Sequence, residues 1–241
     1  IKYRNNFLRL EIEFVRKLNH LKMKLLAEFI GTFFLVAVVV GSGIMADNLS
    51  DGNHAVALLG NTIATGAILF VLIKMFGQIS GAHFNPVVSF IFFLKSELGL
   101  GKFIQYTLCQ VLGGLVAIIV VHYIFNLDIF QISNHPMRVA MAHNSLFVSE
   151  VLATSGLIMT ILFIRKSDKN SIAMGVALFI TAGYWFTSST SFANPAVTIA
   201  RFFTDTFTGI SLTSLPYFVL GQIVGSVIGL YIYKLFYRDW N

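Results

Sequence analysis

Two short stretches carry the polar groups with the clearest chemical use in this otherwise apolar chain. They read GAHFNPVV at residues 81–88 and SFANPAVT at residues 191–198, and each contains an Asn-Pro pair, at Asn85 and Asn194. Proline is favoured at the first position of a helix, where its missing N–H leaves no hydrogen bond unmade. An asparagine just before it caps the helix through its side-chain oxygen and keeps an amide donor for other partners. We therefore expect two helix starts, each presenting a hydrogen-bond donor.

Two acidic and two amide side chains form a second matched set. Glu28 in AEFIGT is echoed by Glu150 in SEVLAT, and Gln110 in CQVLGG is echoed by Gln222 in GQIVGS. Carboxylates inside apolar segments are costly, so each needs a function or a set of donors. One hypothesis is a proton relay or ion site. The other, which we favour, is a structural acceptor for backbone N–H groups near the Asn-Pro pairs, with the glutamines in the same role.

The composition indicates a membrane protein. The 241 residues are 56% hydrophobic and 12% charged, about half the charged share of a soluble domain. The sequence shows no nucleophile–base pair, metal-ligand cluster or phosphate loop, and it has one cysteine. We therefore predict no enzymatic activity, no metal and no cofactor.

The apolar residues fall into six long segments and two short ones. A helix needs about 20 apolar residues to cross the hydrocarbon layer. We predict spans at residues 25–45, 55–77, 103–125, 146–165, 171–187 and 213–235. The two half-length segments, 86–95 and 195–203, each begin at an Asn-Pro pair.

The basic residues predict the orientation. With six spans, all but two of the 17 Lys and Arg fall on one side, the exceptions being Arg138 and Arg201. The positive-inside rule makes that side cytoplasmic, with both termini there and the protein in the cell (inner) membrane. The net charge of +6 is then topological, and no nucleic-acid partner is expected.

The expected domains follow from these spans. Residues 1–22 repeat apolar side chains at helical spacing, which predicts an amphipathic helix on the inner membrane surface; upstream sequence before a start at Met23 is the equal alternative. Residues 23–125 form one repeat, residues 126–145 an external loop, and residues 146–241 a second repeat with a short cytoplasmic end.

Three full spans per repeat place the two repeats in opposite orientations. This is an inverted repeat, in which two re-entrant half-helices meet at the membrane centre. Their free backbone groups must be buried in protein or line a watery cavity, since lipid cannot satisfy them. The fold class is therefore an all-α membrane protein with six transmembrane helices and two re-entrant half-helices. Two capping turns in surface loops, without a pore, are the alternative.

At these residues the chain resembles the aquaporin, or major intrinsic protein, family. SGAHFNPVVSF and SFANPAVT are similar to its two signature loops and AEFIGTFFLV to its first helix, over residues 23–237. The resemblance implies a narrow pore for water and small neutral solutes in the bilayer, and a homotetramer. It implies a pore centre and a ladder of acceptor carbonyls. The centre would consist of Asn85, Pro86, Val87, Asn194, Pro195 and Ala196. The ladder would consist of Gly81, Ala82, His83, Thr190, Ser191 and Phe192.

The chain departs from the family pattern at the selectivity filter. Water-selective members carry an arginine three residues after the second Asn, where this chain has Val197. Counting from the motifs maps the remaining filter positions to Thr65, Ala182 (with Gly183 as the alternative) and Ser191. This small, uncharged set resembles a bacterial, wide-filter, aquaglyceroporin-like subgroup. Arg201, one turn beyond Val197, either leans toward the outer mouth or pairs with Asp205; we expect the former.

The leading hypothesis is a passive channel for water and small uncharged solutes such as glycerol or undissociated arsenous acid, closed to ions and protons. Two alternatives stay open. One is a strict water channel in which Arg201 serves as the filter arginine. The other is a secondary transporter, since inverted repeats and broken helices occur in that class as well, with Glu28 and Glu150 as the available coupling residues.

Overall fold

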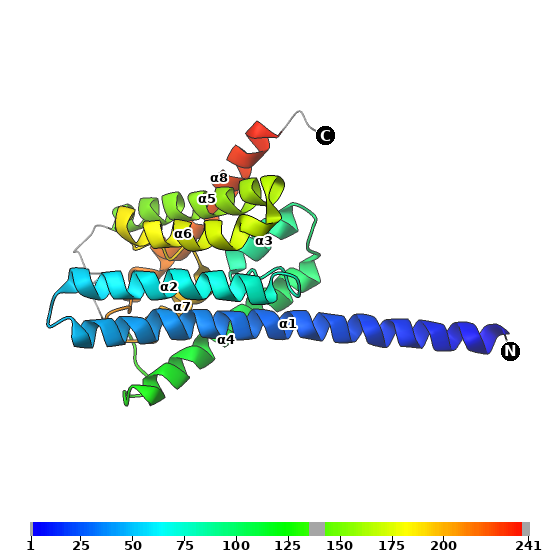
Figure 1. Ribbon diagram of the computed structural model, residues 1–241, viewed down its shortest axis with the longest axis horizontal. Coiled ribbons are helices and arrows are strands. Elements are labelled where there is room, and N and C mark those ends of the chain that lie inside the picture. The colour runs from blue at the N-terminus through cyan, green and yellow to red at the C-terminus, as the bar shows by residue number, and fades with distance from the viewer. Residues whose placement is uncertain (1, 135–142, 238–241) are drawn as a thin grey trace.

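The computed structural model describes residues 2–134 and 143–237, and gives the backbone alone for 2–15 and 143. The described residues are helices and connecting segments without strands, which confirms the predicted all-α class (Figure 1). The first half contains α1 (Lys2–Leu49), α2 (His54–Phe76), α3 (Pro86–Leu94) and α4 (Leu100–Ile124). The second half contains α5 (His143–Ser167), the 3₁₀ turn η1 (Lys169–Ser171), α6 (Ile172–Phe186), α7 (Pro195–Phe202) and α8 (Leu215–Phe236).

Five of the described helices are long and apolar enough to cross a membrane. They are the segments Arg16–Leu49, His54–Phe76, Leu100–Ile124, Asn144–Ser167 and Leu215–Phe236. The predicted sixth span is α6, which has 15 residues. At 1.5 Å per residue it is about 22 Å long, so it is shorter than the hydrocarbon layer. The irregular segment 187–194 that follows it leads back to α7.

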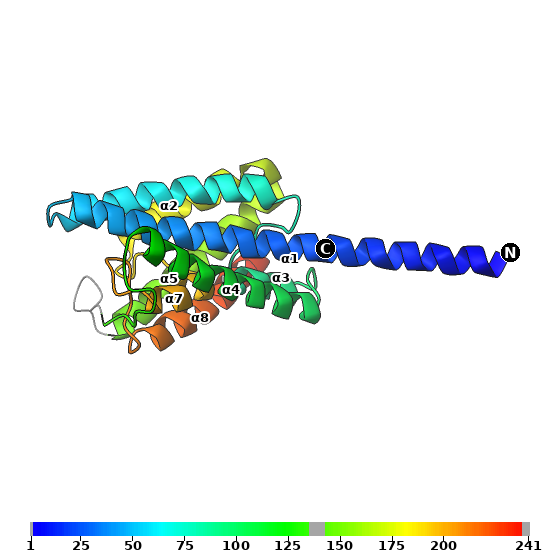
Figure 2. The ribbon, with the colours of Figure 1, turned by 90° about the horizontal axis from the view of Figure 1, so that it is seen from below.

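The two halves use the same packing. In the first half α1 packs against α2 and α4, and in the second α5 packs against α6 and α8 (Figures 1 and 2). Close crossings depend on glycine: a Cβ on Gly113 would overlap the Phe29 carbonyl, and one on Gly225 would lie 2.5 Å from the Val151 carbonyl. Small residues let membrane helices approach in this way, since lipid gives no hydrophobic drive for association.

The half-length helices lie between the halves. Both α3 and α7 contact α4 and α8, and they contact each other. Large apolar side chains on the outer surface, such as those of Leu108, Leu178 and Leu220, are more than half exposed. This apolar exterior is what a lipid-facing surface requires, while the shared interior holds the short helices.

The N-terminal segment differs from the prediction. Helix α1 runs without a break from Lys2 to Leu49, so residues 2–22 continue along the axis of the first span (Figure 2). A helix lying on the membrane surface would need a bend near residue 22, and the structure has none. The sequence there contains neither proline nor glycine, the residues that most often bend a helix.

Candidate pore

The two Asn-Pro pairs start α3 and α7 in the same way. The side-chain oxygen Oδ1 of Asn85 accepts from the Val87 N–H at 3.0 Å, and that of Asn194 accepts from the Ala196 N–H at 3.0 Å. In each case the proline occupies the first helical turn. The first hydrogen-bond donors of both short helices are therefore partly satisfied by the residue that precedes them.

The amide groups of the same asparagines join the two halves. Asn85 Nδ2 donates to the Ala193 carbonyl at 2.7 Å, and Asn194 Nδ2 donates to the Phe84 carbonyl at 2.8 Å. The two helix starts thus meet tip to tip in the buried interior. An amide group has two hydrogens, so each asparagine keeps one N–H beyond this cross-link. Both asparagines line the same cavity.

Glu28 holds the first re-entrant loop. Its Oε1 accepts from the Ser80 hydroxyl at 2.6 Å and the His83 N–H at 3.0 Å. Its Oε2 accepts from the Phe84 N–H and from Gln110 Nε2, both at 2.7 Å. The side chain is fully buried, and these four hydrogen bonds offset the cost of removing its carboxylate from water.

Glu150 repeats this arrangement in the second loop. Its Oε1 accepts from the Ser189 hydroxyl at 2.5 Å and the Phe192 N–H at 3.0 Å, and its Oε2 from the Ala193 N–H at 2.8 Å and Gln222 Nε2 at 2.7 Å. Neither glutamate is among the residues that line the cavity. These contacts agree with the hypothesis that both glutamates are structural acceptors for the backbone N–H groups of the re-entrant loops.

Replacing Glu150 with Gln is expected to destabilise the protein. The amide has one acceptor oxygen, so its NH₂ group would face donors that the carboxylate now accepts. Leaving two buried donors unpaired costs about 2–6 kcal/mol. Thermal unfolding in detergent, followed by loss of a monodisperse peak, measures the effect. Glu97→Gln is the matched control, because Glu97 pairs with Arg165 and Lys95 near the surface. Equal stability of the two variants would contradict this role for Glu150.

Both re-entrant loops adopt the same unusual backbone. In the first, Gly81, Ala82 and Phe84 have φ between 49° and 98°; in the second, Thr190, Ser191 and Ala193 have φ between 47° and 59°. Five of these six residues are not glycine, and such conformations cost about 1–3 kcal/mol each. The glutamates and the asparagine cross-links hold both segments in this shape.

A cavity of about 680 Å³ runs through the centre of the molecule. Each long helix on its wall contributes one stripe: Leu35 and Val39 from α1, Thr65, Leu69 and Ile73 from α2, Leu157 and Ile161 from α5, and Ala173, Val176, Ile180 and Tyr184 from α6. Of the predicted ladder residues, Gly81, Ala82, His83, Ser191 and Phe192 line the cavity. Thr190, Pro86, Val87, Pro195 and Ala196 are buried without being among its lining residues.

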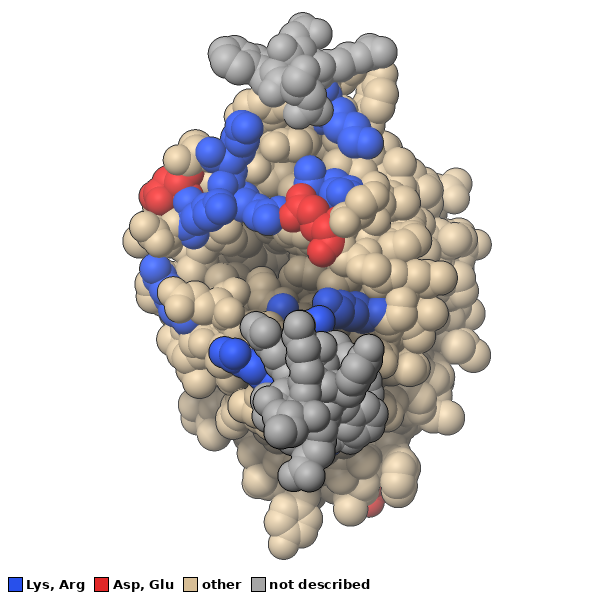
Figure 3. Space-filling view, turned by 90° about the vertical axis from the view of Figure 1, so that its right-hand side faces the viewer, with Lys and Arg blue, Asp and Glu red and all other residues tan. Residues whose placement is uncertain are grey.

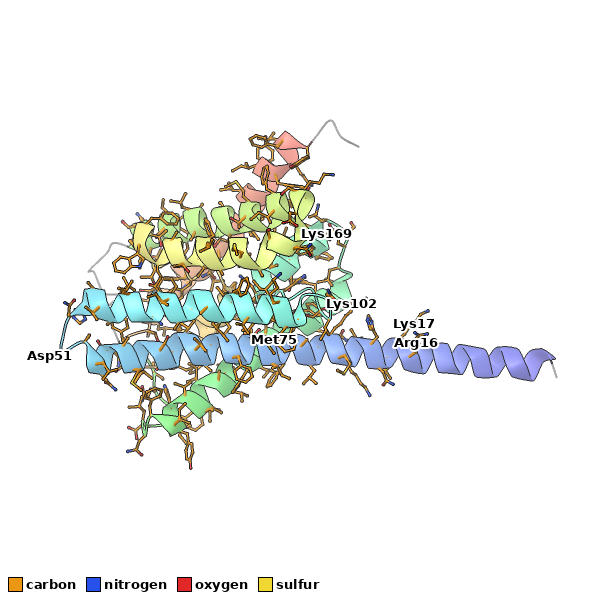
Figure 4. All side chains as sticks on the ribbon, viewed as in Figure 1. Arg16, Lys17, Asp51, Met75, Lys102 and Lys169 are labelled. Carbon is orange, nitrogen blue, oxygen red and sulfur yellow. The ribbon has the colours of Figure 1, made fainter. Side chains whose placement is uncertain are left out.

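One end of the cavity is basic. Lys24, Lys74, Lys102, Arg165 and Lys169 line it there, and Figure 3 shows Lys and Arg gathered around the hollow on this face. Lys102 and Lys169 lie at the end opposite Asp51 (Figure 4). This is the end that the charge pattern predicts to be cytoplasmic.

The other end holds the predicted filter residues, with one correction. Thr65, Ser191 and Val197 line the cavity. Ala182 does not, because it lies on the exposed face of α6, where Leu178 is 61% and Trp185 51% exposed. The alternative, Gly183, is buried, and a Cβ there would lie 2.7 Å from the Ser191 side chain.

Tyr184, which sequence reasoning missed, takes the place expected of Ala182. Its side chain is 4% exposed and lines the cavity, and its hydroxyl lies 3.0 Å from the Thr65 hydroxyl. The signal in the sequence is the spacing of Ala173, Val176, Ile180 and Tyr184, which puts them on one helix face.

Arg201 points toward the cavity. Its side chain is 3% exposed and lines the cavity wall, its guanidinium carbon lies 3.5 Å from the centre of the Phe192 ring, and its Nε donates to the Thr208 carbonyl. The Asp205 carboxylate accepts from the Asn134 N–H. Arg201 is thus held from two sides at the end of the cavity where Val197 also lies.

His83 has the contacts of a packed residue. Its Nδ1 lies 3.0 Å from the Ser89 hydroxyl, and its ring stacks on Phe92 with 4.7 Å between centroids. The Arg165 guanidinium lies over the ring of Phe92, 4.8 Å from its centroid. The ring thus fixes the first loop against α3.

Comparison with known proteins points to one family. The profile described as "Major intrinsic protein" matches residues 15–171 and 165–240. The chain is 46% identical to aquaglyceroporin AqpS of Rhizobium meliloti over 210 residues, covering 87% of this chain and 88% of that protein. It is 27% identical to aquaporin Z of Photorhabdus laumondii, covering 90% and 98%. The X-ray structure of the aquaglyceroporin from Plasmodium falciparum matches with a TM-score of 0.70 over 91% of this chain and 96% of that one, at 22% identity.

Proposed function

The chain belongs to the major intrinsic protein family, and on that premise we propose that it passes glycerol-sized neutral solutes, undissociated arsenous acid among them, and excludes ions and protons. It is an integral multi-pass membrane protein with the aquaporin-like fold, and its family and its aquaglyceroporin relative support a channel for water and small solutes such as glycerol. It is not an enzyme. Passage of arsenous acid and exclusion of ions go beyond this assignment and are the content of the proposal.

The cavity is the observation that carries the proposal. One continuous space is lined by both asparagines, by Ser191 and Val197 at one end, and by basic side chains at the other. Its wall combines apolar stripes from the long helices with polar backbone from the two loops. A small solute with hydroxyl groups and a carbon skeleton meets both kinds of surface there.

Exclusion of cations follows from the two short helices. Their N-termini meet at the asparagines, and each is equivalent to about half a positive charge. A cation or proton at this point faces both positive ends, as in aquaporin-type pores generally. Neutral solutes meet donors at the same place and are not repelled.

Three small side chains at the filter end support passage of solutes larger than water, although the bulkier Tyr184 stands where Ala182 was expected. Thr65, Ser191 and Val197 are small and uncharged, and they line the cavity together. The strict water channel remains the second candidate because the Arg201 guanidinium also lines this end of the cavity. The variants Val197→Arg and Arg201→Ala separate these two candidates.

Passive transport is the expected result in proteoliposomes. Glycerol and arsenous acid should equilibrate across the membrane and stop there, because Glu28 and Glu150, the candidate coupling residues, are occupied by the re-entrant loops and lie off the cavity. Stopped-flow light scattering measures the solute fluxes. Accumulation driven by an imposed sodium or proton gradient would instead assign the protein to the secondary transporters.

We also propose that the protein lies in the cell (inner) membrane with the basic end of the cavity facing the cytoplasm, following the positive-inside rule. Four copies, one pore in each, form the assembly typical of the family. Protease accessibility of the segment near Lys17 in sealed right-side-out vesicles tests the orientation. Native mass spectrometry tests the assembly.

A further inference from the structure

The basic end of the cavity gathers cations from separate segments of the chain. They are Lys24 on α1, Lys74 on α2, Lys102 on α4, Arg165 on α5 and Lys169 on η1, and all five line the cavity. These five residues form the basic mouth. Figure 3 shows Lys and Arg around a hollow on this face, and Figure 4 labels two of the five at this end. Folding therefore concentrates positive charge at one end of the cavity.

The acidic residue among the described lining is Glu97, and its charge is already used. Its carboxylate lies 2.6 Å from Arg165 Nη1 and 3.5 Å from Lys95 Nζ. The Arg165 guanidinium also lies over the Phe92 ring, 4.8 Å from its centroid. Glu97 thus holds Arg165 in place and leaves the four lysines of the basic mouth without a carboxylate from the cavity wall.

Lys74 is the lysine of this set with a neighbour of opposite charge. Its Nζ donates to the Asn170 carbonyl at 3.1 Å, and the carboxylate of Asp168 is near enough to interact with it electrostatically. Within the part of the chain that the structure describes, the other three lysines of the basic mouth form no ion pair. The mouth therefore carries several positive charges that the described protein does not offset.

The positive-inside rule accounts for basic residues at this end but not for their place along the cavity wall. Lys95 and Lys166 lie at the same end and are placed differently. Their Nζ atoms lie over the rings of Tyr233 and Tyr237, at 5.3 and 5.7 Å from the centroids, and neither lysine lines the cavity. The rule is satisfied by either location. Cations along the wall therefore call for a second reason.

An anion drawn to the basic mouth meets an apolar wall further in. Ile161, one helical turn from Arg165, lines the cavity there, as do Ile73 and Val176. A multivalent anion in this stretch loses its hydration and gains no charged partner, which is costly. Water and small neutral solutes carry no such cost. The mouth thus raises the local concentration of anions at a point where they stop.

We propose that the basic mouth binds a soluble multivalent phosphate anion, such as the triphosphate group of a nucleotide, and that the bound anion obstructs the pore. Lysine ammonium groups bind phosphate as point charges, and a row of phosphates reaches lysines on different segments at once. The lysines line the cavity and not the lipid-facing surface, which favours a soluble anion over a lipid headgroup. The inference holds whichever neutral solute the pore passes.

Binding is tested with inorganic triphosphate and the full chain in nanodiscs of zwitterionic lipid, by isothermal titration calorimetry. The double variant Lys102→Gln, Lys169→Gln should weaken binding at least about tenfold, because two charges next to the anion are lost. Lys166→Gln is the matched control, since it removes a charge at the same end but off the cavity wall; it should change the affinity less than about twofold. Added salt should weaken binding to the native protein.

Obstruction is tested by stopped-flow water flux in proteoliposomes with triphosphate on both sides, against sodium chloride of equal osmolality and ionic strength. At about ten times the Kd roughly nine-tenths of the sites are filled, so native water flux should fall at least about fivefold. At the same concentration the double variant should keep most of its own flux without triphosphate. Water is the measured solute, so failure of the proposed glycerol permeability does not affect the result.

Four outcomes would overturn the inference. The first is triphosphate binding that the double variant leaves unchanged, and the second is an equal loss in Lys166→Gln, which would assign the attraction to the overall charge of this end. The third is binding without loss of water flux, which would place the anion outside the path. The fourth is absence of triphosphate binding while the native protein, but not the double variant, retains anionic phospholipid in native mass spectrometry; this would assign the lysines to a lipid headgroup.

Discussion

Replacing Val197 with Arg is expected to lower glycerol permeability at least about tenfold and water permeability less than about threefold. Val197 is buried, lies one helical turn before Arg201 on α7 and lines the cavity with Ser191 and Thr65. A guanidinium there fills the space that a carbon skeleton needs and presents fixed donors that suit single-file water. A tenfold change corresponds to about 1.4 kcal/mol of barrier height, a modest demand for such a steric change. Stopped-flow measurement of both solutes gives the two rates.

Val197→Leu is the control for this variant. It adds bulk without charge or donors, so it should reduce both fluxes to a similar extent. A selective loss of glycerol flux in Val197→Arg but not in Val197→Leu would assign the effect to the guanidinium. Unchanged glycerol flux in Val197→Arg, in well-assembled protein, would show that residue 197 does not set the width.

Unchanged glycerol flux in Val197→Arg would be explained if Arg201 already narrows this end of the cavity. If its guanidinium already serves as the filter cation, Arg201→Ala should raise glycerol flux several-fold, and Val197→Arg should change little. Arg201 also donates to the Thr208 carbonyl and lies against the Phe192 ring, so loss of the whole side chain also alters packing. Arg201→Gln keeps a donor at this position without the charge and separates packing from electrostatics. Water flux without glycerol flux in the native protein would favour the strict water channel.

Replacing Asn194 with Asp is expected to reduce neutral-solute flux at least about tenfold and to admit cations. The capping oxygen survives the change, so Ala196 N–H keeps its acceptor. The donor to the Phe84 carbonyl is lost, and a carboxylate oxygen takes its place 2.8 Å from another acceptor. The added negative charge also offsets the positive potential of the two helix N-termini that meet there, which lowers the barrier to cations. Proton and cation currents in planar bilayers, beside stopped-flow water flux, measure both effects.

Asn85→Asp is the matched variant, since Asn85 Nδ2 donates to the Ala193 carbonyl in the same geometry. The two variants should behave alike if the halves contribute equally to the centre. Native water flux combined with an unchanged ion barrier in either variant would show that its asparagine does not face the permeating solute.

The local starts of the short helices were predictable from the sequence. The predicted segments 86–95 and 195–203 correspond to α3, Pro86–Leu94, and α7, Pro195–Phe202. An Asn-Pro pair fixes a helix start through the backbone of its own residues, so no distant contact is needed. The pairing of Glu28 and Glu150 with the re-entrant loops followed from the repeat, because a buried carboxylate and a buried row of N–H groups require each other.

The filter position on α6 was decided only by the tertiary structure. The prediction counted back from Asn194 to Ala182, through the irregular segment 187–194, which contains three residues with positive φ. Each helical residue turns the side chain by about 100°, so an error of one or two positions moves it from the cavity to the lipid-facing surface. Tyr184 faces the cavity because α6 packs on α2 at Gly66.

The directions of Arg201 and of the N-terminal helix were likewise beyond the sequence. Spacing in the sequence placed Arg201 one turn from Val197, but it allowed the side chain either to point to the outer mouth or to pair with Asp205. Its direction follows from contacts with the Phe192 ring and the Thr208 carbonyl, which folding of the segments around α7 brings together. The periodicity of residues 1–22 indicated a helix but not its angle to the first span. Composition, span lengths, repeat symmetry and caps are local or additive properties, so the sequence determined them by itself. The rotation of a helix about its axis and the direction of a long side chain depend on the surfaces packed against them, and these exist only in the folded protein.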